Sequence, residues 1–439
     1  MNSPTISLNG LSAHAPPTLT LRRTILLVAA IVVAIQGLLL LTASNGVLHG
    51  SLFDPDCYMH LQRAYRLMTG AGWPTAADPR INAPFGYSIH WTSLFDLLLV
   101  LGATPLRWLG EEPHAALYIW GSCISPLLLI GALAVLAWAL KPWVKGASFL
   151  WLTVLVFTQP QFSGSFLVGR PDHHSLVMAL LIVQLAWLYA YFDRRAGFRW
   201  TCAAGVAAGL QMITSVEALV SVLVVAAALA FGWLFCRQRT LATLTVYLLA
   251  CVLTMAGWLV LTQPQDFFHL AYDRISIVHI VALTCGGIAI AALAAADARG
   301  WFEGRMIRSA AALTLAVALS GSVTALWFPD FFRGPWPHLD PVVMTWHRKI
   351  NELQPLLPTD WSSTAQFFAQ LTAPLLSIPL ILSRVRKGSQ PFLLPSLIGL
   401  VVFGAIALFQ MRWSAEVQAA TLLPWTLTTR QIMRSPRAL

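Results

Sequence analysis

Long apolar runs alternate with short polar segments along most of this chain. Each run is about 20 residues long, the length that a helix needs to cross a hydrocarbon core. Because unpaired backbone groups are costly in lipid, such runs cross as helices. The runs lie near residues 24–43, 115–140, 147–160, 175–192, 200–216, 218–235, 241–262, 279–296, 308–327, 363–383, 391–409 and 413–427. The pattern predicts an all-α polytopic membrane protein with about 12 transmembrane helices.

Composition supports this class. Of the 439 residues, 57% are hydrophobic and 10% are charged, and the mean hydropathy is +0.68. Soluble domains carry about 25% charged residues. The net charge of +10 comes from basic residues scattered in small groups between apolar runs, which argues against a nucleic-acid surface. The six cysteines have no paired spacing, which indicates buried thiols and neither a disulfide framework nor a metal cluster.

The basic loops predict the orientation. They lie at Arg22 and Arg23 and at 141–145, 193–199, 236–239, 297–308, 384–387 and 429–437, and they hold most of the 28 Lys and Arg residues. The positive-inside rule places them in the cytoplasm. An even number of crossings must separate successive cytoplasmic loops, so the run 93–109, with Asp96, must not cross. We expect it to lie on, or dip into, the outer face.

This topology divides the chain into three parts. Residues 1–20 are expected to be a disordered cytoplasmic tail, 21–427 a transmembrane domain, and 428–439 a second cytoplasmic tail. Outer loops are expected at about 44–114, 161–174 and 328–362. The scarce polar residues then gather at the outer ends of helices: Asp54, Asp56, His60, Arg63, Asp172, His173, His174, Glu217, Asp273, Arg274, His279, Glu352 and Arg412. The sequence predicts an extracytoplasmic site on a multi-pass protein of the cell (inner) membrane.

The stretch DPDCYMH (54–60) places Asp54, Asp56 and His60 after the first apolar run. Hard oxygen ligands with an imidazole suit a Mg or Mn ion. A helix N-cap explains an aspartate at this position equally well.

The stretch GRPDHH (169–174) opens another apolar run. Asp172 and His174 can converge on one ion if a helix begins between them. The alternative is again an N-cap, with the two histidines at the membrane interface.

Three further charged residues are candidates for the site. Glu217 is either a functional carboxylate or the tip of a loop. Glu352 lies in the long hydrophilic segment 327–361, which is either a lid or a solvated loop. Arg412 is either a clamp for a lipid phosphate or an arginine that reaches to the interface.

Taken in order, these motifs resemble the membrane domain of the oligosaccharyltransferases, glycosyltransferases of the C fold class, and especially the archaeal members. The matching segments are DCYMH (56–60), ADPRINAPFGYSIHW (77–91), GRPDHH (169–174), KINELQP (349–355) and Arg412, within residues 20 to 427. The sequence departs from the family at Lys349, where Ser or Thr is usual, and at Gln62, where Arg is common. No segment matches the WWDYG motif that reads the sequon, so we expect a protein that lacks the C-terminal soluble domain.

The resemblance implies a metal-dependent glycosyltransferase. Its donor is a sugar or oligosaccharide on a polyprenyl phosphate or diphosphate, and its acceptor is a saccharide, a lipid or a protein. The implied ligands of a Mn or Mg ion are Asp56, Asp172, His174 and Glu352, with Asp56 and Glu352 as catalytic residues. The implied substrate-binding residues are Arg412, Arg274, Arg170, His60 and Asp54. No nucleic-acid partner is expected.

Two other classes of protein remain open. A transporter or flippase for a lipid-linked saccharide is also polytopic, although it places charges at the membrane midplane and has internal repeats, which this sequence lacks. A metal-independent polysaccharide ligase or polymerase uses the same donors, and only its insensitivity to EDTA distinguishes it.

Overall fold

A computed structural model describes residues 19–42, 46–144, 147–236, 240–333, 341–347, 349–386 and 391–434. The predicted tail 1–20 lies almost entirely outside these residues. In the described part no strand occurs, and an isolated bridge joins Asp78 to Tyr87. The α-helices are α1 (Leu21–Leu40), α2 (Pro55–Met68), α3 (Leu94–Trp108), α4 (Pro113–Leu140), α5 (Ala147–Val156), α6 (Pro160–Gly164), α7 (His173–Phe192), α8 (Phe198–Thr214), α9 (Leu219–Cys236), α10 (Thr240–Thr262), α11 (Ile277–Ala298), α12 (Met306–Trp327), α13 (Pro341–His347), α14 (Trp361–Arg386), α15 (Leu394–Ala407) and α16 (Ser414–Arg434). The short 3₁₀ helices are η1 (Val47–His49), η2 (Val216–Ala218), η3 (Pro264–Asp266), η5 (Asn351–Leu353), η6 (Pro391–Leu393) and η7 (Met411–Trp413).

The prediction of an all-α membrane protein is confirmed, whereas the total of about 12 crossings is not. Among the described residues, 8 helices are long and apolar enough to cross a membrane, and they correspond to α1, α4, α7, η2 with α9, α10, α11, α12 and most of α14. The other four segments expected to cross form α5, α8, α15 and α16, which are shorter or less apolar. The run 93–109 forms α3, which has 15 residues and is shorter than a typical span.

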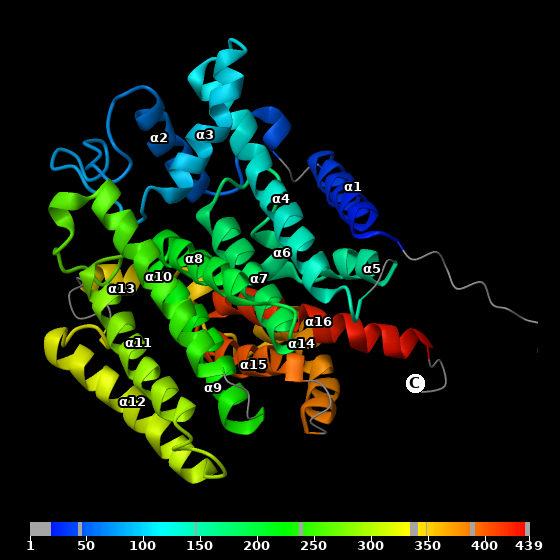
Figure 1. Ribbon diagram of the computed structural model, residues 1–439. Coiled ribbons are helices and arrows are strands. Elements are labelled where there is room, and N and C mark those ends of the chain that lie inside the picture. The colour runs from blue at the N-terminus through cyan, green and yellow to red at the C-terminus, as the bar shows by residue number, and fades with distance from the viewer. Residues whose placement is uncertain are drawn as a thin grey trace, which may run out of the picture.

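Helix α7 occupies the centre of the bundle (Figure 1). Its sequence is apolar on every side, which is typical of a helix that is surrounded by protein. It packs against α4 on one side and α8 on another, and most of its side chains are buried. The N-terminus of this central helix carries the motif Asp172-His173-His174.

Buried amides tie the central helices together. Gln184 on α7 donates to Gln211 on α8 at 2.7 Å, and Tyr247 on α10 donates its hydroxyl proton to Gln184 at 2.6 Å. Gly205 on α8 faces the backbone of α10, where a Cβ would meet Tyr247 O at 2.4 Å. Small residues and interhelical hydrogen bonds are the usual means of packing helices in membranes.

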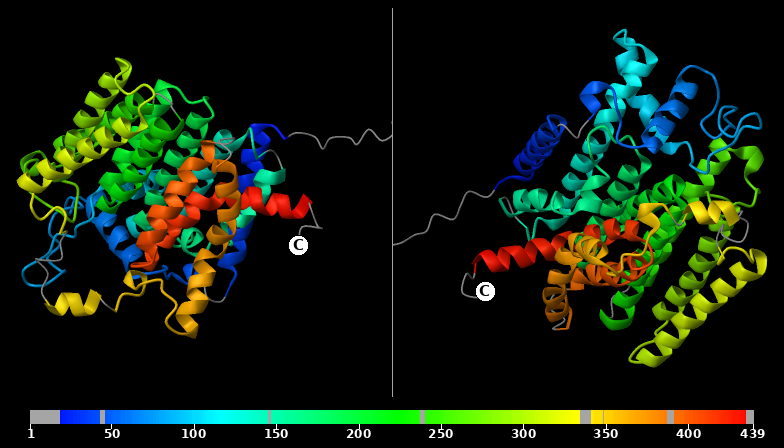
Figure 2. Two further views of the ribbon diagram at one scale, coloured as in Figure 1. Left: turned by 90° about the horizontal axis from the view of Figure 1, so that it is seen from below. Right: turned by 180° about the vertical axis from the view of Figure 1, so that it is seen from behind.

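Helices α2 and α3, with the segment 69–93 between them, lie together at one end of the molecule (Figure 1). They share a small core with α4 and the start of α7, which includes Phe95, Leu99 and Leu117. The α11–α12 pair stands at the edge of the bundle (Figures 1 and 2) and packs on the body through α10.

One tight turn joins this end of the molecule to α7. Gly169 has φ +78°, and a Cβ there would lie 2.0 Å from Val47. Its carbonyl accepts from the Phe53 amide at 3.1 Å, and its amide donates to Ser122 O at 2.9 Å. Only glycine meets these conformational and steric demands without strain. The turn brings the chain before α2 beside the chain before α7.

Candidate active site

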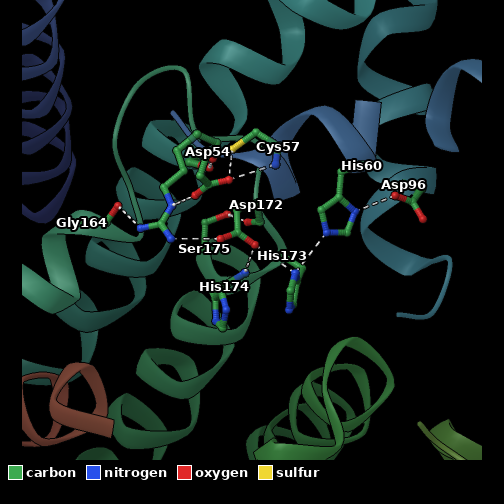
Figure 3. A network of polar contacts seen from close by, with 11 residues as sticks. Asp54, Cys57, His60, Asp96, Gly164, Asp172, His173, His174 and Ser175 are labelled. Carbon is green, nitrogen blue, oxygen red and sulfur yellow. Dashed lines mark hydrogen bonds and ion pairs between the residues drawn. The ribbon is translucent and has the colours of Figure 1, made fainter. Parts of the chain in front are cut away.

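Asp54 and Asp172, at the N-termini of α2 and α7, lie close together (Figure 3), and both pair with one arginine. Asp54 is the N-cap of α2 and accepts from the Cys57 amide at 3.0 Å. Asp172 is the N-cap of α7 and accepts from the His174 amide at 3.2 Å. Arg170 lies between the caps, with Nε 3.2 Å from Asp54 Oδ2 and Nη2 3.2 Å from Asp172 Oδ2. Capping therefore holds both carboxylates in place and does not exclude a further role for them.

Asp56 lies in the first turn of α2, two residues after the N-cap Asp54. In the described part of the chain its carboxylate makes no hydrogen bond. Burial, together with the negative charges of Asp172 and Asp54, raises the pKa of Asp56 to about 6. Glu352 adds a smaller effect of the same sign. Crowded carboxylates of this kind are stabilised by a cation.

Glu352 reaches this site from η5, far along the sequence. Two backbone hydrogen bonds fix the segment that follows it, from Met411 N to Gln354 O at 2.8 Å and from Leu356 N to Ala407 O at 3.3 Å. Burial raises the pKa of Glu352, the charge of Arg412 opposes this shift, and Asp172 adds to it.

A cavity of about 40 Å³ lies among these elements. Its charged and imidazole lining groups are Arg170, His174, Glu217, Glu352, Arg412 and Glu416. One water needs about 10–15 Å³, so the cavity holds a few waters or a hydrated ion. The structure thus brings Arg170, His174, Glu352 and Arg412, predicted separately, to one cavity.

Arg412 lies on η7 and forms an ion pair with Glu217. Its Nε has no hydrogen-bond partner among the described atoms and is buried. An arginine with an unused buried donor, facing a polar cavity, is suited to bind a phosphate or carboxylate ligand.

The tightest group of possible metal ligands differs from the predicted set. One ligand atom each from His60, Asp172 and His173 lie within 4.8 Å of one another, and all three residues are buried. The predicted set of Asp56, Asp172, His174 and Glu352 shares only Asp172 with this group. Burial lowers the pKa of His60, and the Asp96 carboxylate opposes this effect.

Arg274 has a different neighbour from Arg412. Its Nε is 3.9 Å from Asp273 Oδ1, and it does not line the cavity that contains Arg412. Asp96 was missed as a site residue, because an acidic residue in an apolar helix of uncertain depth suggested the membrane surface. It is fully buried between α2 and α3, where it binds His60 and Arg63.

No protein-family model matches the chain. The curated dolichyl-phosphooligosaccharide-protein glycotransferase 2 of Archaeoglobus fulgidus is 29% identical over 139 residues, which are 31% of this chain and 21% of that protein. The apo crystal structure of the A. fulgidus oligosaccharyltransferase superposes with a TM-score of 0.72 and 15% identity, over 94% of this chain and 51% of that one. The archaeal oligosaccharyltransferase AglB of the same organism, in complex with an inhibitory peptide and a dolichol-phosphate, superposes with a TM-score of 0.73 and 14% identity, over 95% of this chain and 50% of that one.

The chain has the fold of an oligosaccharyltransferase. The resemblance predicted from the motifs is therefore confirmed at the level of fold. The chain spans about half the length of these solved structures, 51% and 50% of the two chains. A further A. fulgidus structure with zinc and sulfate matches with a TM-score of 0.68 and 14% identity over 94% of this chain and 49% of that one.

Proposed function

We propose that this protein is a metal-dependent membrane glycosyltransferase of the oligosaccharyltransferase type. It transfers a sugar or oligosaccharide from a polyprenyl phosphate or diphosphate to an acceptor on the extracytoplasmic face. The observation that supports this proposal best is the meeting of Asp56, Asp172 and Glu352 beside the cavity that Arg412 lines.

The donor set fits a divalent ion. The proposed ligands are Asp56, Asp172, His174 and Glu352, which supply carboxylate oxygens and an imidazole. Within the described residues the Asp56 carboxylate makes no hydrogen bond, and the negative charges of Asp172 and Asp54 lie near it. A bound Mn or Mg ion supplies Lewis-acid stabilisation of the negative charge that develops on the leaving phosphate.

The protein's own residues have three tasks in this reaction. Arg412 binds the phosphate through the guanidinium donors that face the cavity, and it does so in surroundings where screening by water is weak. Asp56 orients the acceptor or takes its proton, and the proposed cation beside it would keep the pKa of this carboxyl low. Glu352, brought in by its loop, closes the site against water and so limits hydrolysis of the donor.

The class of acceptor is proposed from ligands that are bound in the solved relatives. One A. fulgidus structure holds a tethered acceptor peptide with an NVT sequon, and another holds dolichol-phosphate. We propose that this protein also uses a lipid-linked donor. Because the chain spans about half of those structures, we propose a peptide as one acceptor class beside saccharides and lipids.

The proposal is tested by Glu352→Gln. We expect the variant to lower the rate of transfer from a polyprenyl-linked donor by 100-fold or more, because the amide keeps the shape of the side chain but loses its charge. This loss corresponds to an increase in the activation free energy on the order of 3 kcal/mol. Asp360→Asn, on an exposed carboxylate of the same outer segment, is the matched control and should transfer at the normal rate. A wild-type rate of transfer by Glu352→Gln contradicts the proposed role of Glu352.

Two assays separate this proposal from its rivals. Mass spectrometry of lipid-linked sugars in a deletion strain should show one donor accumulating and one glycoconjugate disappearing, whereas loss of a flippase leaves the donor on the cytoplasmic leaflet. EDTA should abolish transfer and Mn²⁺ should restore it, whereas a metal-independent ligase or polymerase is unaffected.

A further inference from the structure

A second cavity, of about 230 Å³, lies between α2 and the segment 74–89. It shares no lining residue with the cavity that contains Arg412. Arg80 lines it with a side chain that is 61% exposed, so the cavity opens to solvent. A cavity of about 150 Å³ is large enough for a benzene ring. This one therefore has room for a single six-membered sugar ring.

The lining of this second cavity is cationic. Arg63, Arg66 and Arg80 line it, together with one carboxylate, that of Asp78. Asp78 Oδ2 is 3.4 Å from Arg66 Nη1 and 2.7 Å from Arg80 Nη2, so it is shared by two arginines. Arg63 pairs with Asp96 instead. Two carboxylates thus offset three guanidinium groups, and one positive charge remains in excess.

Arg63 has a hydrogen-bond donor that the protein does not use. The residue is 4% exposed, its Nε donates to Pro74 O at 3.0 Å, and its Nη2 donates to Trp91 O and Thr92 O, both at 2.9 Å. Its Nη1 is buried and has no hydrogen-bond partner among the described atoms. A buried donor without an acceptor is costly, and the favoured ligand of a guanidinium group is a carboxylate or phosphate oxygen. The cavity is therefore suited to an anion.

The rest of the lining suits more than a simple anion. Gln62 lines the cavity and makes no side-chain hydrogen bond within the described residues. Its amide can both donate and accept, as a sugar hydroxyl also does. Ile81, Ile89 and Tyr87 supply apolar surface, which packs against the carbon skeleton of a ring. Gln62 is also a position at which the sequence departs from the oligosaccharyltransferases.

One face of α2 leads from the candidate active site to this cavity. Asp56, Met59, Arg63 and Arg66 follow one another at spacings of three and four residues, which places them on the same side of the helix. At 1.5 Å per residue, Arg63 lies roughly 10 Å along the axis from Asp56. A saccharide that reacts beside Asp56 can extend along this face to the second cavity.

We infer that the second cavity binds an acidic sugar residue, a ring that carries a carboxylate, within the saccharide substrate. The guanidinium groups of Arg63, Arg66 and Arg80 bind the carboxylate, and Gln62 binds a hydroxyl group. The inference rests on the proposed function, which supplies a saccharide as substrate. The acidic residue belongs either to the glycan of the donor or to a saccharide acceptor, and the chemistry that recognises it is the same in both.

Binding of small probes to the full-length protein in detergent tests the inference, without metal, donor or acceptor. Saturation-transfer difference NMR titrations compare D-glucuronate with acetate, which lacks the ring, and with D-glucose, which lacks the charge. Glucuronate should bind at least about 10-fold more tightly than either, because only this probe uses both the cationic and the ring-binding parts of the lining.

Two variants locate the binding. Arg80→Gln should weaken glucuronate binding by about 10-fold, because it removes a cation and leaves more of the Asp78 charge in the cavity. Gln62→Ala should weaken glucuronate binding but leave acetate binding unchanged. Arg333→Gln, on an exposed arginine that also has a neighbouring aspartate, is the matched control and should bind glucuronate normally.

Three results overturn the inference: no binding of glucuronate, equal affinities for glucuronate and acetate, or equal weakening by Arg80→Gln and Arg333→Gln. The comparison of the three probes needs no variant, so poor folding of a variant does not obscure it. Selective binding of glucuronate by a protein that transfers no sugar counts against the proposed reaction alone. Glycosyl transfer by a protein without this selectivity counts against the second site alone.

Steady-state kinetics identify which substrate carries the acidic residue. Arg80→Gln should raise the KM for that substrate about 10-fold with little change in kcat, because the cavity lies away from the reacting bond. A raised KM for the lipid-linked donor places the acidic residue in the donor glycan, and a raised KM for the acceptor places it there. Unchanged KM values for both substrates overturn the inference.

Discussion

Single residues in this protein serve the fold and the site at once. Asp54 and Asp172 cap helices, as the simplest interpretation of their positions predicts, and both also hold Arg170. The cap fixes the carboxylate because the backbone N–H groups of a helix start cannot move. At the residue scale, then, the structural and the functional interpretations of these motifs are compatible.

Glu217 supplies a prediction at this scale, since it pairs with Arg412 where the phosphate is proposed to bind. Glu217→Gln should free the guanidinium and lower the KM for the lipid-linked donor about two- to fivefold, because a partly exposed pair contributes about 1 kcal/mol or less. Arg412→Gln should raise the same KM. Steady-state kinetics with a purified donor measures both. A raised KM in Glu217→Gln shows instead that Glu217 binds the substrate.

Asp78 supplies a second prediction, on acid sensitivity. Hydrogen bonds from Arg80, with additional attraction from Arg66, lower the pKa of Asp78 to about 2. The unfolded value is about 3.9, so this stabilisation is present above about pH 4 and is lost as the pH falls towards 2. Limited pepsin digestion of the segment 69–93 should therefore accelerate between pH 4.5 and 2.5. Asp78→Asn should already be cleaved fast at pH 4.5, and a wild-type rate that is independent of pH contradicts the assignment.

At the scale of elements, helix ends and pinned loops build the site. The Gln36 amide of α1 donates to Phe166 O at 3.0 Å and accepts from Val168 N at 2.9 Å, which fixes the chain just before Arg170. Gln418 of α16 accepts from Phe162 N at 2.9 Å in the same segment. Buried amides on distant helices thus replace the regular backbone bonds that this irregular segment lacks.

The close approach of α8 and α10 gives a third prediction. Gly205→Ala should lower the unfolding temperature in detergent, because the new Cβ meets the backbone of α10 and overpacking costs about 1–3 kcal/mol. Gly257→Ala, on α10 with nothing within 4 Å of the added Cβ, should be neutral or slightly stabilising. Equal melting temperatures for the two variants show that the helices can separate without cost.

At the scale of the whole molecule, the proposed reaction needs the site on the outer face. In a cysteine-free background, Arg80→Cys should react with a membrane-impermeant maleimide in intact cells, since the Arg80 side chain is 61% exposed. Arg299→Cys, exposed in a loop predicted to be cytoplasmic, should react only after permeabilisation. The reverse pattern places the site in the cytoplasm and contradicts the proposed donor.

The sequence by itself determined the helical class, the apolar segments and the chemistry of the scarce polar residues. Apolar runs of about 20 residues have one stable solution in lipid, and acidic residues before such runs are helix caps wherever the helices lie. The motifs also predicted the fold correctly, through DCYMH, GRPDHH and KINELQP.

Only the tertiary structure decided which polar groups meet. The positions of Asp96 and Glu217 depend on how α3 packs against α2 and how η2 approaches η7, and no local pattern encodes such contacts between distant segments. The number of crossings was undecided for the same reason, because α5, α8 and α15 are short helices whose apolar residues suit burial in protein as well as in lipid. Hydropathy measures preference for an apolar environment and does not distinguish between the two.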